Sequence, residues 1–156
     1  MNSSIFREYD IRGIADEDLT DDVVSDIGLA MGTIFAKKGL KKISIGRDCR
    51  KSSERIFNVL SSSIIKAGIS IVDLGMITTP VLYFSLYGLK IDGGVMITAS
   101  HNPSDYNGFK AAIGKDVLSA AQIQEIKNII ISKSFIQDTN LGIIEELNLI
   151  DIYKKD

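Results

Sequence analysis

The sequence predicts an α/β fold, a three-layer α/β/α sandwich with a mixed, mostly parallel sheet. Segments in which apolar residues recur at helical spacing alternate with short apolar segments of the strand type. The strand-like segments before residue 98 are separated by helix-length connections, which favour parallel pairing. A chain of 156 residues also buries roughly 70% of its extended surface, enough for the core of one domain.

The first predicted helix spans residues 20–39. Thr20 is a typical N-cap, two aspartates follow it at the positive end of the helix, and apolar residues then recur at helical spacing. Gly28 and Gly32 lie four residues apart, so another element can pack closely against this helix. In the preceding segment, Phe6 and Ile11 are expected to form a strand or turn that closes the sheet.

Three apolar segments predict the central strands, namely residues 43–45, 69–74 and 94–98. The helix between the first two begins at Ser52 or Ser53 and ends at Gly68. The next helix is short and ends near Gly88. Thr79 is expected to cap it, with Pro80 at its first position.

The last third of the chain is expected to add one strand and one helix. Residues 108–113 follow the third strand too closely for a helical crossover, so they should lie antiparallel to a neighbour, at an edge of the sheet. Ser119 and Gln122 have the spacing of a capping box at the start of the final helix.

After Ser134 the pattern weakens, and residues 150–156 lack a helix cap, a glycine or a proline. The predicted organisation is therefore an α/β/α domain over residues 1–134. Residues 135–156 would be a linker and the start of a truncated following domain.

Composition excludes several classes of protein. The single cysteine, Cys49, excludes an intramolecular disulfide. The amino-terminal residues lack the apolar region of a secretory signal, so a cytoplasmic protein is expected. The least charged segment, residues 74–89, is shorter than a membrane helix requires and is interrupted by glycine and proline. Eighteen basic and twenty acidic residues, without a basic stripe, argue against nucleic acid.

The loop Thr98-Ala99-Ser100-His101-Asn102-Pro103 is the most informative motif. It leaves the carboxyl end of a predicted buried strand, where ligands bind in open α/β sheets. Asn102 precedes a proline and should be extended. Asn107-Gly108 predicts a sharp reversal with positive φ angles, after which Lys110 returns close enough to reach an anion on Ser100.

The residue types alone leave alternatives open. Ser100 is either an exposed loop serine or a nucleophile, and His101, the only histidine, is either solvent-exposed or functional. A serine-hydrolase triad is disfavoured, because His101 would have to serve its own neighbour and no Gly-x-Ser-x-Gly elbow is present.

Four segments in this order resemble the α-D-phosphohexomutases. Their phosphoserine loop is resembled by residues 98–103 followed by Asp105-Tyr106-Asn107-Gly108-Phe109-Lys110. The amino-terminal signature of the phosphomannomutase/phosphoglucomutase branch is resembled by Phe6-Arg7-Glu8-Tyr9-Asp10-Ile11-Arg12-Gly13. Between these two lie the other matching segments, Gly46-Arg47-Asp48-Cys49-Arg50 and Thr78-Thr79-Pro80. The chain therefore resembles the first of four domains of that family.

The resemblance implies that Ser100 carries a phosphate and exchanges it with a hexose phosphate, interconverting the 1-phosphate and the 6-phosphate through a bisphosphate. It implies catalytic roles for Ser100, His101, Lys110 and Arg12, and binding of substrate or phosphate by Tyr9, Arg12, Asn102 and Lys110. It also implies Mg²⁺, ligated by a phosphate oxygen on Ser100. The isolated fragment is expected to be inactive, and its partners are the sugar phosphate and the other domains of the polypeptide.

The departures from the family pattern matter as well. An Asp-Gly-Asp-Gly-Asp-type metal cluster and the family's sugar-recognition and distal phosphate loops are absent. The acidic residues at 16–18, 21 and 22 are either a substitute metal site or, preferably, a solvated helix start.

Three alternatives concern other residues and other functions. Asp48 either orders its loop by pairing with an arginine, Arg47 or Arg50, and supports the Ser100 loop, or these three residues together form the outer layer of a phosphate or metal site. The alternative functions are a phosphoglucosamine mutase and a non-catalytic anion-binding or regulatory module.

Overall fold

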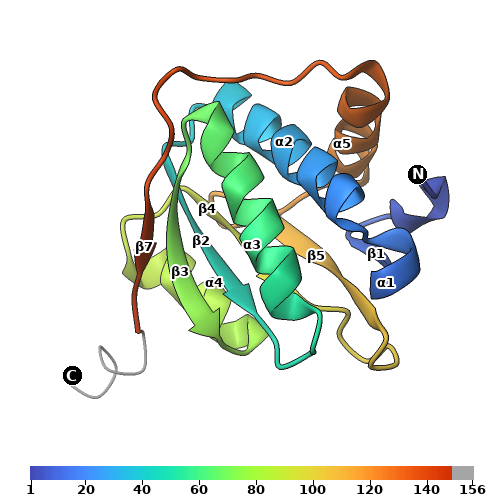
Figure 1. The fold of residues 1–156 in the computed structure, drawn as a ribbon. Coiled ribbons are helices and arrows are strands. Elements are labelled where there is room, and N and C mark those ends of the chain that lie inside the picture. Colours follow the sequence, from blue (N-terminus) through green and yellow to red (C-terminus); the bar gives the residue numbers. More distant parts are fainter. Residues whose placement is uncertain (149–156) are drawn as a thin grey trace.

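In the computed structural model of the chain, which describes residues 1–148, one mixed sheet lies between layers of helices (Figure 1). The strands are β1 (Ile11–Ile14), β2 (Lys42–Arg47), β3 (Ser70–Met76), β4 (Gly93–Ile97), β5 (Tyr106–Ile113), β6 (Asp116–Val117) and β7 (Ile144–Glu146). The helices are α1 (Ala15–Asp18), α2 (Asp21–Lys37), α3 (Ser53–Ile64), α4 (Thr79–Gly88) and α5 (Ala120–Ser132), with 3-10 turns η1 (Ser3–Ile5) and η2 (Ile65–Ala67).

The sheet has the order β1-β5-β4-β2-β3-β7, and β6 pairs with β5. Strands β4, β2, β3 and β7 pair in parallel, as the helical crossovers between β2, β3 and β4 require. Strand β5 pairs antiparallel with both β4 and β1. The predicted α/β/α sandwich with a mixed sheet is confirmed.

The two faces of the sheet are covered unequally (Figure 1). Helices α2, α3 and α5 share a large apolar core with one face. The other face receives α4, which packs on β2 and β4 and buries Leu82 together with Val72, Leu74 and Met96. Because α4 does not extend over β1 and β5, side chains on that part of the sheet remain accessible.

Local sequence signals account for the helix ends and for one close packing contact. The Thr20 side chain accepts a hydrogen bond from the Val23 amide, and Ser119 and Gln122 form the predicted capping box. A Cβ atom on Gly28 would lie 2.6 Å from the Cβ of Ser63, so the glycine lets α2 approach α3 closely, as predicted.

The start of α4 differs from the prediction by one residue. The N-cap is Thr78 rather than Thr79, and Pro80 is therefore at the second helical position instead of the first. The Thr78 side chain makes no capping hydrogen bond, and proline is tolerated throughout the first turn because those amides lack helical partners.

Strand β5 corrects two predictions. It does not lie at an edge, because β1 pairs on its outer side. Asn107 and Gly108 make no reversal either: both belong to β5, opposite Gly13 and Arg12, and neither has a positive φ. The chain has already reversed before residue 106. Gly108 is required for a different reason, because a Cβ there would lie 2.1 Å from the Ile11 carbonyl oxygen.

Replacing Gly108 with alanine should therefore lower the free energy of unfolding by about 1–3 kcal/mol or more, since the β1 backbone must move. Gly88→Ala is the matched control, because its Cβ would meet only the Phe84 ring and alanine favours a helix. Chemical denaturation measures both. Equal stability of the two variants would contradict this account of Gly108.

Beyond α5 the chain returns along the molecule and adds β7 to the edge of the sheet, parallel to β3. The domain boundary at residue 134 stays a prediction. The expectation that the chain is cut concerns residues 150–156, which lie outside the described part. Within residues 1–148, every helix is too short or too polar to cross a bilayer.

Candidate active site

Ser100 lies just beyond the carboxyl end of β4 in an exposed loop. Its φ of 55° is in the left-handed region, which non-glycine residues rarely adopt. Such a backbone costs about 1–3 kcal/mol and persists only where its surroundings enforce it. The Ser100 hydroxyl has no hydrogen-bond partner among residues 1–148.

Two neighbours bind the peptide groups of Ser100. The Ser100 amide donates to Thr98 Oγ1 over 3.0 Å, and its carbonyl accepts from Arg50 Nη2 over 2.9 Å. Thr98 in turn donates to Asp48 Oδ2 over 2.8 Å. The loop is thus tied to the end of β2, and the side chain of Ser100 is left free.

Two cationic side chains lie on the face of the sheet that α4 leaves open. Arg12 is opposite Gly108 in the β1–β5 register, so Lys110, two residues further along β5, projects on the same face. Arg12 donates to Asn102 Oδ1 over 2.6 Å and forms an ion pair with Asp10. The Lys110 ammonium has no side-chain partner within residues 1–148. Lys110 is therefore the cation that remains available to an anion.

These residues surround one open hollow of about 530 Å³, lined by Arg12, Ser100, His101, Asn102, Pro103 and Lys110. The fold thus brings together all four predicted catalytic residues from β1, β5 and the loop after β4. The predicted binding residue Asn102 is also there, although its side-chain oxygen is already bonded to Arg12.

Tyr9 lies apart from this hollow. It lines a neighbouring hollow of about 380 Å³ that shares Arg12 and Lys110 with the first and includes Tyr83 of α4. Tyr9 is highly exposed. The two hollows adjoin each other at Arg12 and Lys110.

The acidic residues at 16–18, 21 and 22 lie in the first turns of α1 and α2. Asp18 accepts hydrogen bonds from the Asn2 side chain and the Ile14 amide, and these bonds lower the pKa of its carboxyl. Within the described residues, no three His, Cys, Asp or Glu side chains cluster closely enough to hold a metal ion. This favours the interpretation of the acidic run as a helix start.

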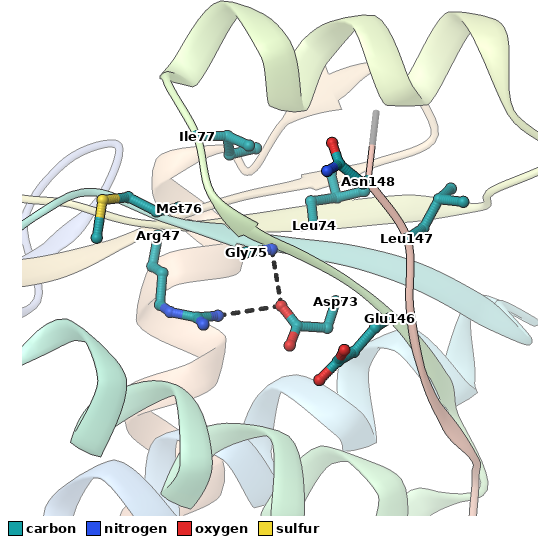
Figure 2. A pocket seen from close by; sticks show the side chains of 9 residues that line it. All are labelled: Arg47, Asp73, Leu74, Gly75, Met76, Ile77, Glu146, Leu147 and Asn148. Carbon is teal, nitrogen blue, oxygen red and sulfur yellow. Dashed lines mark hydrogen bonds and ion pairs between the residues drawn. The ribbon is translucent and has the colours of Figure 1, made fainter. Parts of the chain in front are cut away.

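A different hollow, of about 550 Å³, lies at the carboxyl ends of β3 and β7 (Figure 2). In it the Arg47 guanidinium donates to Asp73 Oδ1 over 3.0 Å, and the Gly75 amide donates to the same oxygen over 2.8 Å. Arg47 also lies 4.7 Å from the centre of the Phe57 ring. Because this pair is neutralised internally and does not contact the Ser100 loop, we assign it a structural role.

Comparison with known proteins agrees with the fold and with the order of the motifs. The family model described as phosphoglucomutase/phosphomannomutase, alpha/beta/alpha domain I, matches residues 3–137. The chain belongs to the phosphoglucomutase/phosphomannomutase family. It is 41% identical over 153 residues to a phosphoglucomutase of Neisseria gonorrhoeae, covering 98% of this chain and 33% of that protein.

Two further members of the phosphoglucomutase/phosphomannomutase family are similar over nearly the whole chain. A phosphomannomutase/phosphoglucomutase of Pseudomonas aeruginosa is 36% identical over 99% of this chain and 33% of its own length. The crystal structure of a family protein from Burkholderia thailandensis superposes with a TM-score of 0.92 at 34% identity, covering 98% of this chain and 35% of that one. The chain spans about a third of the length of these relatives.

Sequence reasoning assigned no role in the site to several polar residues of this phosphoglucomutase/phosphomannomutase domain. Asp10 pairs with Arg12 from two residues away, a spacing that places both on one face of an extended segment. Ser53 and the buried Asn107 hydrogen-bond each other across 54 residues of sequence, for which no local signal exists. The predicted pairing of Asp48 with an arginine is confirmed, and the partner is Arg50.

Proposed function

We propose that this chain supplies the phosphoryl carrier of a hexose phosphate mutase, with Ser100 as the residue that is phosphorylated. The phosphoserine gives its phosphoryl group to a hydroxyl of a hexose monophosphate, and the P–O bond to Ser100 breaks as the new sugar phosphate bond forms. The resulting bisphosphate returns its other phosphoryl group to Ser100. The net reaction interconverts the hexose 1-phosphate and 6-phosphate.

The observation that carries the proposal is that the Ser100 hydroxyl and the Lys110 ammonium, which have no side-chain partner among residues 1–148, line the same hollow. A phosphoserine brings about −1.5 to −2 charges, so the transfer requires fixed cations and donors around it. Lys110 supplies a point charge to the phosphate. The planar guanidinium of Arg12 supplies hydrogen-bond donors, and its bonds to Asn102 and Asp10 hold it in place. His101 and Lys110 are the candidates for proton transfer: the imidazole of His101 can accept the proton of the attacking hydroxyl, and the ammonium of Lys110 can donate one to the departing Ser100 oxygen.

The described residues of this chain do not make a Mg²⁺ site by themselves. The carboxylate bonded to the loop through Thr98, Asp48, already accepts from Arg50, Ser53 and Thr98. We propose that a phosphate oxygen on Ser100 is the one ligand that residues 1–148 offer to Mg²⁺, which would neutralise phosphate charge when bound. No step above depends on it.

We also propose that the remaining parts of the site come from other domains of the same polypeptide. The relatives are about three times as long as this chain, and the family model names the matched region domain I. Residues 135–156 would lead to these domains. The isolated fragment should then bind and turn over hexose phosphates poorly, and a cytoplasmic location stays a prediction.

The phosphate on Ser100 tests this function directly. Intact-mass analysis of the native polypeptide that carries this chain should show one phosphate, which peptide mapping places on Ser100. Incubation with a hexose monophosphate should remove it, and a labelled hexose bisphosphate should restore it. A phosphoserine that no hexose phosphate discharges would instead support the non-catalytic module.

A further inference from the structure

We propose that Asp48 and Arg50 are positioning residues that hold Ser100 in its left-handed backbone conformation and so fix the phosphoryl carrier against Lys110. The inference rests on the proposed function of Ser100, but it concerns a different part of the molecule. Both residues lie at the end of β2 and line no part of the hollow formed by Ser100, Arg12 and Lys110.

Arg50 binds four backbone carbonyls between Ser100 and Tyr106, in the segment that follows β4. Its Nη1 donates to the carbonyls of Pro103 over 2.6 Å and Tyr106 over 3.0 Å. Its Nη2 donates to the carbonyls of Ser100 and Asn102, both over 2.9 Å. The Nε group donates to Asp48, so all five N–H groups of the guanidinium have acceptors.

This complete pairing decides between two roles for Arg50. An arginine that recognises substrate phosphate keeps donors free for it, whereas here none remains and the side chain is only 11% exposed. Arg50 therefore acts on the protein backbone. Lysine could not reproduce the arrangement, because it lacks the planar fork that reaches four carbonyls at once.

Asp48 and Arg50, with the groups that they bind, form a hydrogen-bonded network that we call the brace. Asp48 accepts four hydrogen bonds in it. Its Oδ1 accepts from the Arg50 amide over 3.1 Å and from Ser53 Oγ over 2.9 Å. Its Oδ2 accepts from Arg50 Nε over 3.1 Å and from Thr98 Oγ1 over 2.8 Å. A carboxylate has about four lone-pair directions, and all are used.

The brace has a second anchor in β5. The Asn107 side chain donates to Ser53 Oγ over 3.0 Å and accepts from the Gly108 amide over 2.9 Å. The Gly108 carbonyl in turn accepts from the Thr98 amide over 2.9 Å. The brace therefore connects the strand that carries Lys110 with the loop that carries Ser100, through groups that are mostly buried.

The two peptide groups of Ser100 are the end points of this brace. Its amide is bonded to Thr98, which Asp48 holds, and its carbonyl is bonded to Arg50. Without the brace only the turn bond from the Asn102 amide to the Ala99 carbonyl, over 3.1 Å, holds the unusual φ of 55° within the described residues. Rotation about the N–Cα bond of Ser100 moves its side-chain oxygen relative to Lys110. A displacement of about 1 Å at a reacting group can slow a reaction by about 100-fold.

The test compares Arg50→Met with Arg47→Met in the native polypeptide. Arg47 is a matched control: it is the last residue of β2, three positions before Arg50, pairs with Asp73 and is 18% exposed. We expect Arg50→Met to lower kcat about 10- to 100-fold with KM changed less than about threefold. Arg47→Met should lower the melting temperature to a similar extent and leave kcat within about twofold.

A second pair of variants remains informative if Arg50→Met does not fold. Thr98→Val removes the hydroxyl between Asp48 and the Ser100 amide at nearly constant shape, whereas Thr98→Ser keeps it. Thr98→Val should lower kcat about 10-fold or more, and Thr98→Ser should restore most of it. Values of kcat within twofold of the wild type for both Arg50→Met and Thr98→Val would overturn the proposal.

Hydrogen exchange separates the brace from the proposed function. Amides in residues 99–106 should exchange faster in Arg50→Met and Thr98→Val than in the wild type and Arg47→Met, and unchanged exchange would overturn the proposal. If the wild type carries no phosphate and converts no hexose phosphate, the proposed function fails, while the exchange result still decides whether the brace exists.

Discussion

Replacing Ser100 with alanine should lower the mutase activity of the native polypeptide at least about 10⁴-fold, because the group that carries the phosphate is removed. Folding should change little. The Ser100 side chain is exposed and its hydroxyl has no partner among residues 1–148, so its loss leaves no unsatisfied buried group. Steady-state rates in both directions measure the activity, intact mass measures the loss of the phosphate, and thermal melting measures the stability.

Two further variants show whether the hydroxyl or the backbone matters at this position. Ser100→Gly should be as inactive as alanine but more stable by about 0.5–1 kcal/mol, since glycine adopts a φ of 55° without strain. Ser104→Ala changes another exposed serine of the same loop and should keep full activity. Substantial turnover by Ser100→Ala would rule out Ser100 as the carrier.

The parts of the fold that sequence predicts well are those that local chemistry determines. The capping box at Ser119, the N-cap at Thr20 and the glycines on α2 each act within a few residues or through one close contact. The same local rules misread Asn107-Gly108, because an asparagine followed by glycine is typical of a tight turn. In this protein the glycine instead admits the β1 backbone, and the asparagine side chain is buried and bonded to Ser53.

The candidate site shows a similar division. The Ser100 loop is contiguous in sequence, and the return of Lys110 next to it follows from antiparallel pairing of β5 with β4. The ion pair between Asp10 and Arg12 depends on side-chain geometry. So do the hydrogen bonds that occupy every Arg50 donor, which join residues up to 56 positions apart in the sequence. Hydrogen bonds of that range have no spacing rule, so only the folded structure distinguishes the paired cation Arg12 from the unpaired Lys110.

That distinction leads to the second large effect: Lys110→Ala should slow phosphoryl transfer about 10²- to 10³-fold. Arg12 brings a positive charge that Asp10 largely offsets, so Lys110 contributes most of the net charge that this chain places beside the phosphate. Its aliphatic stem lies on an open sheet face, and the cost to stability should be small. Single-turnover discharge of the phosphoserine measures the transfer step separately from folding.

The charge and the shape of Lys110 can be separated by Lys110→Arg and Lys110→Met. The arginine variant should retain more of the transfer rate than methionine, because the positive charge remains in the hollow even though its position shifts. Lys115→Ala is the matched control: Lys115 lies beyond the end of the same strand, over the Tyr87 ring, outside both hollows. A raised KM with an unchanged single-turnover rate in Lys110→Ala would contradict this account. It would mean that Lys110 binds substrate and transition state equally, so another group would have to supply the charge that stabilises the transfer.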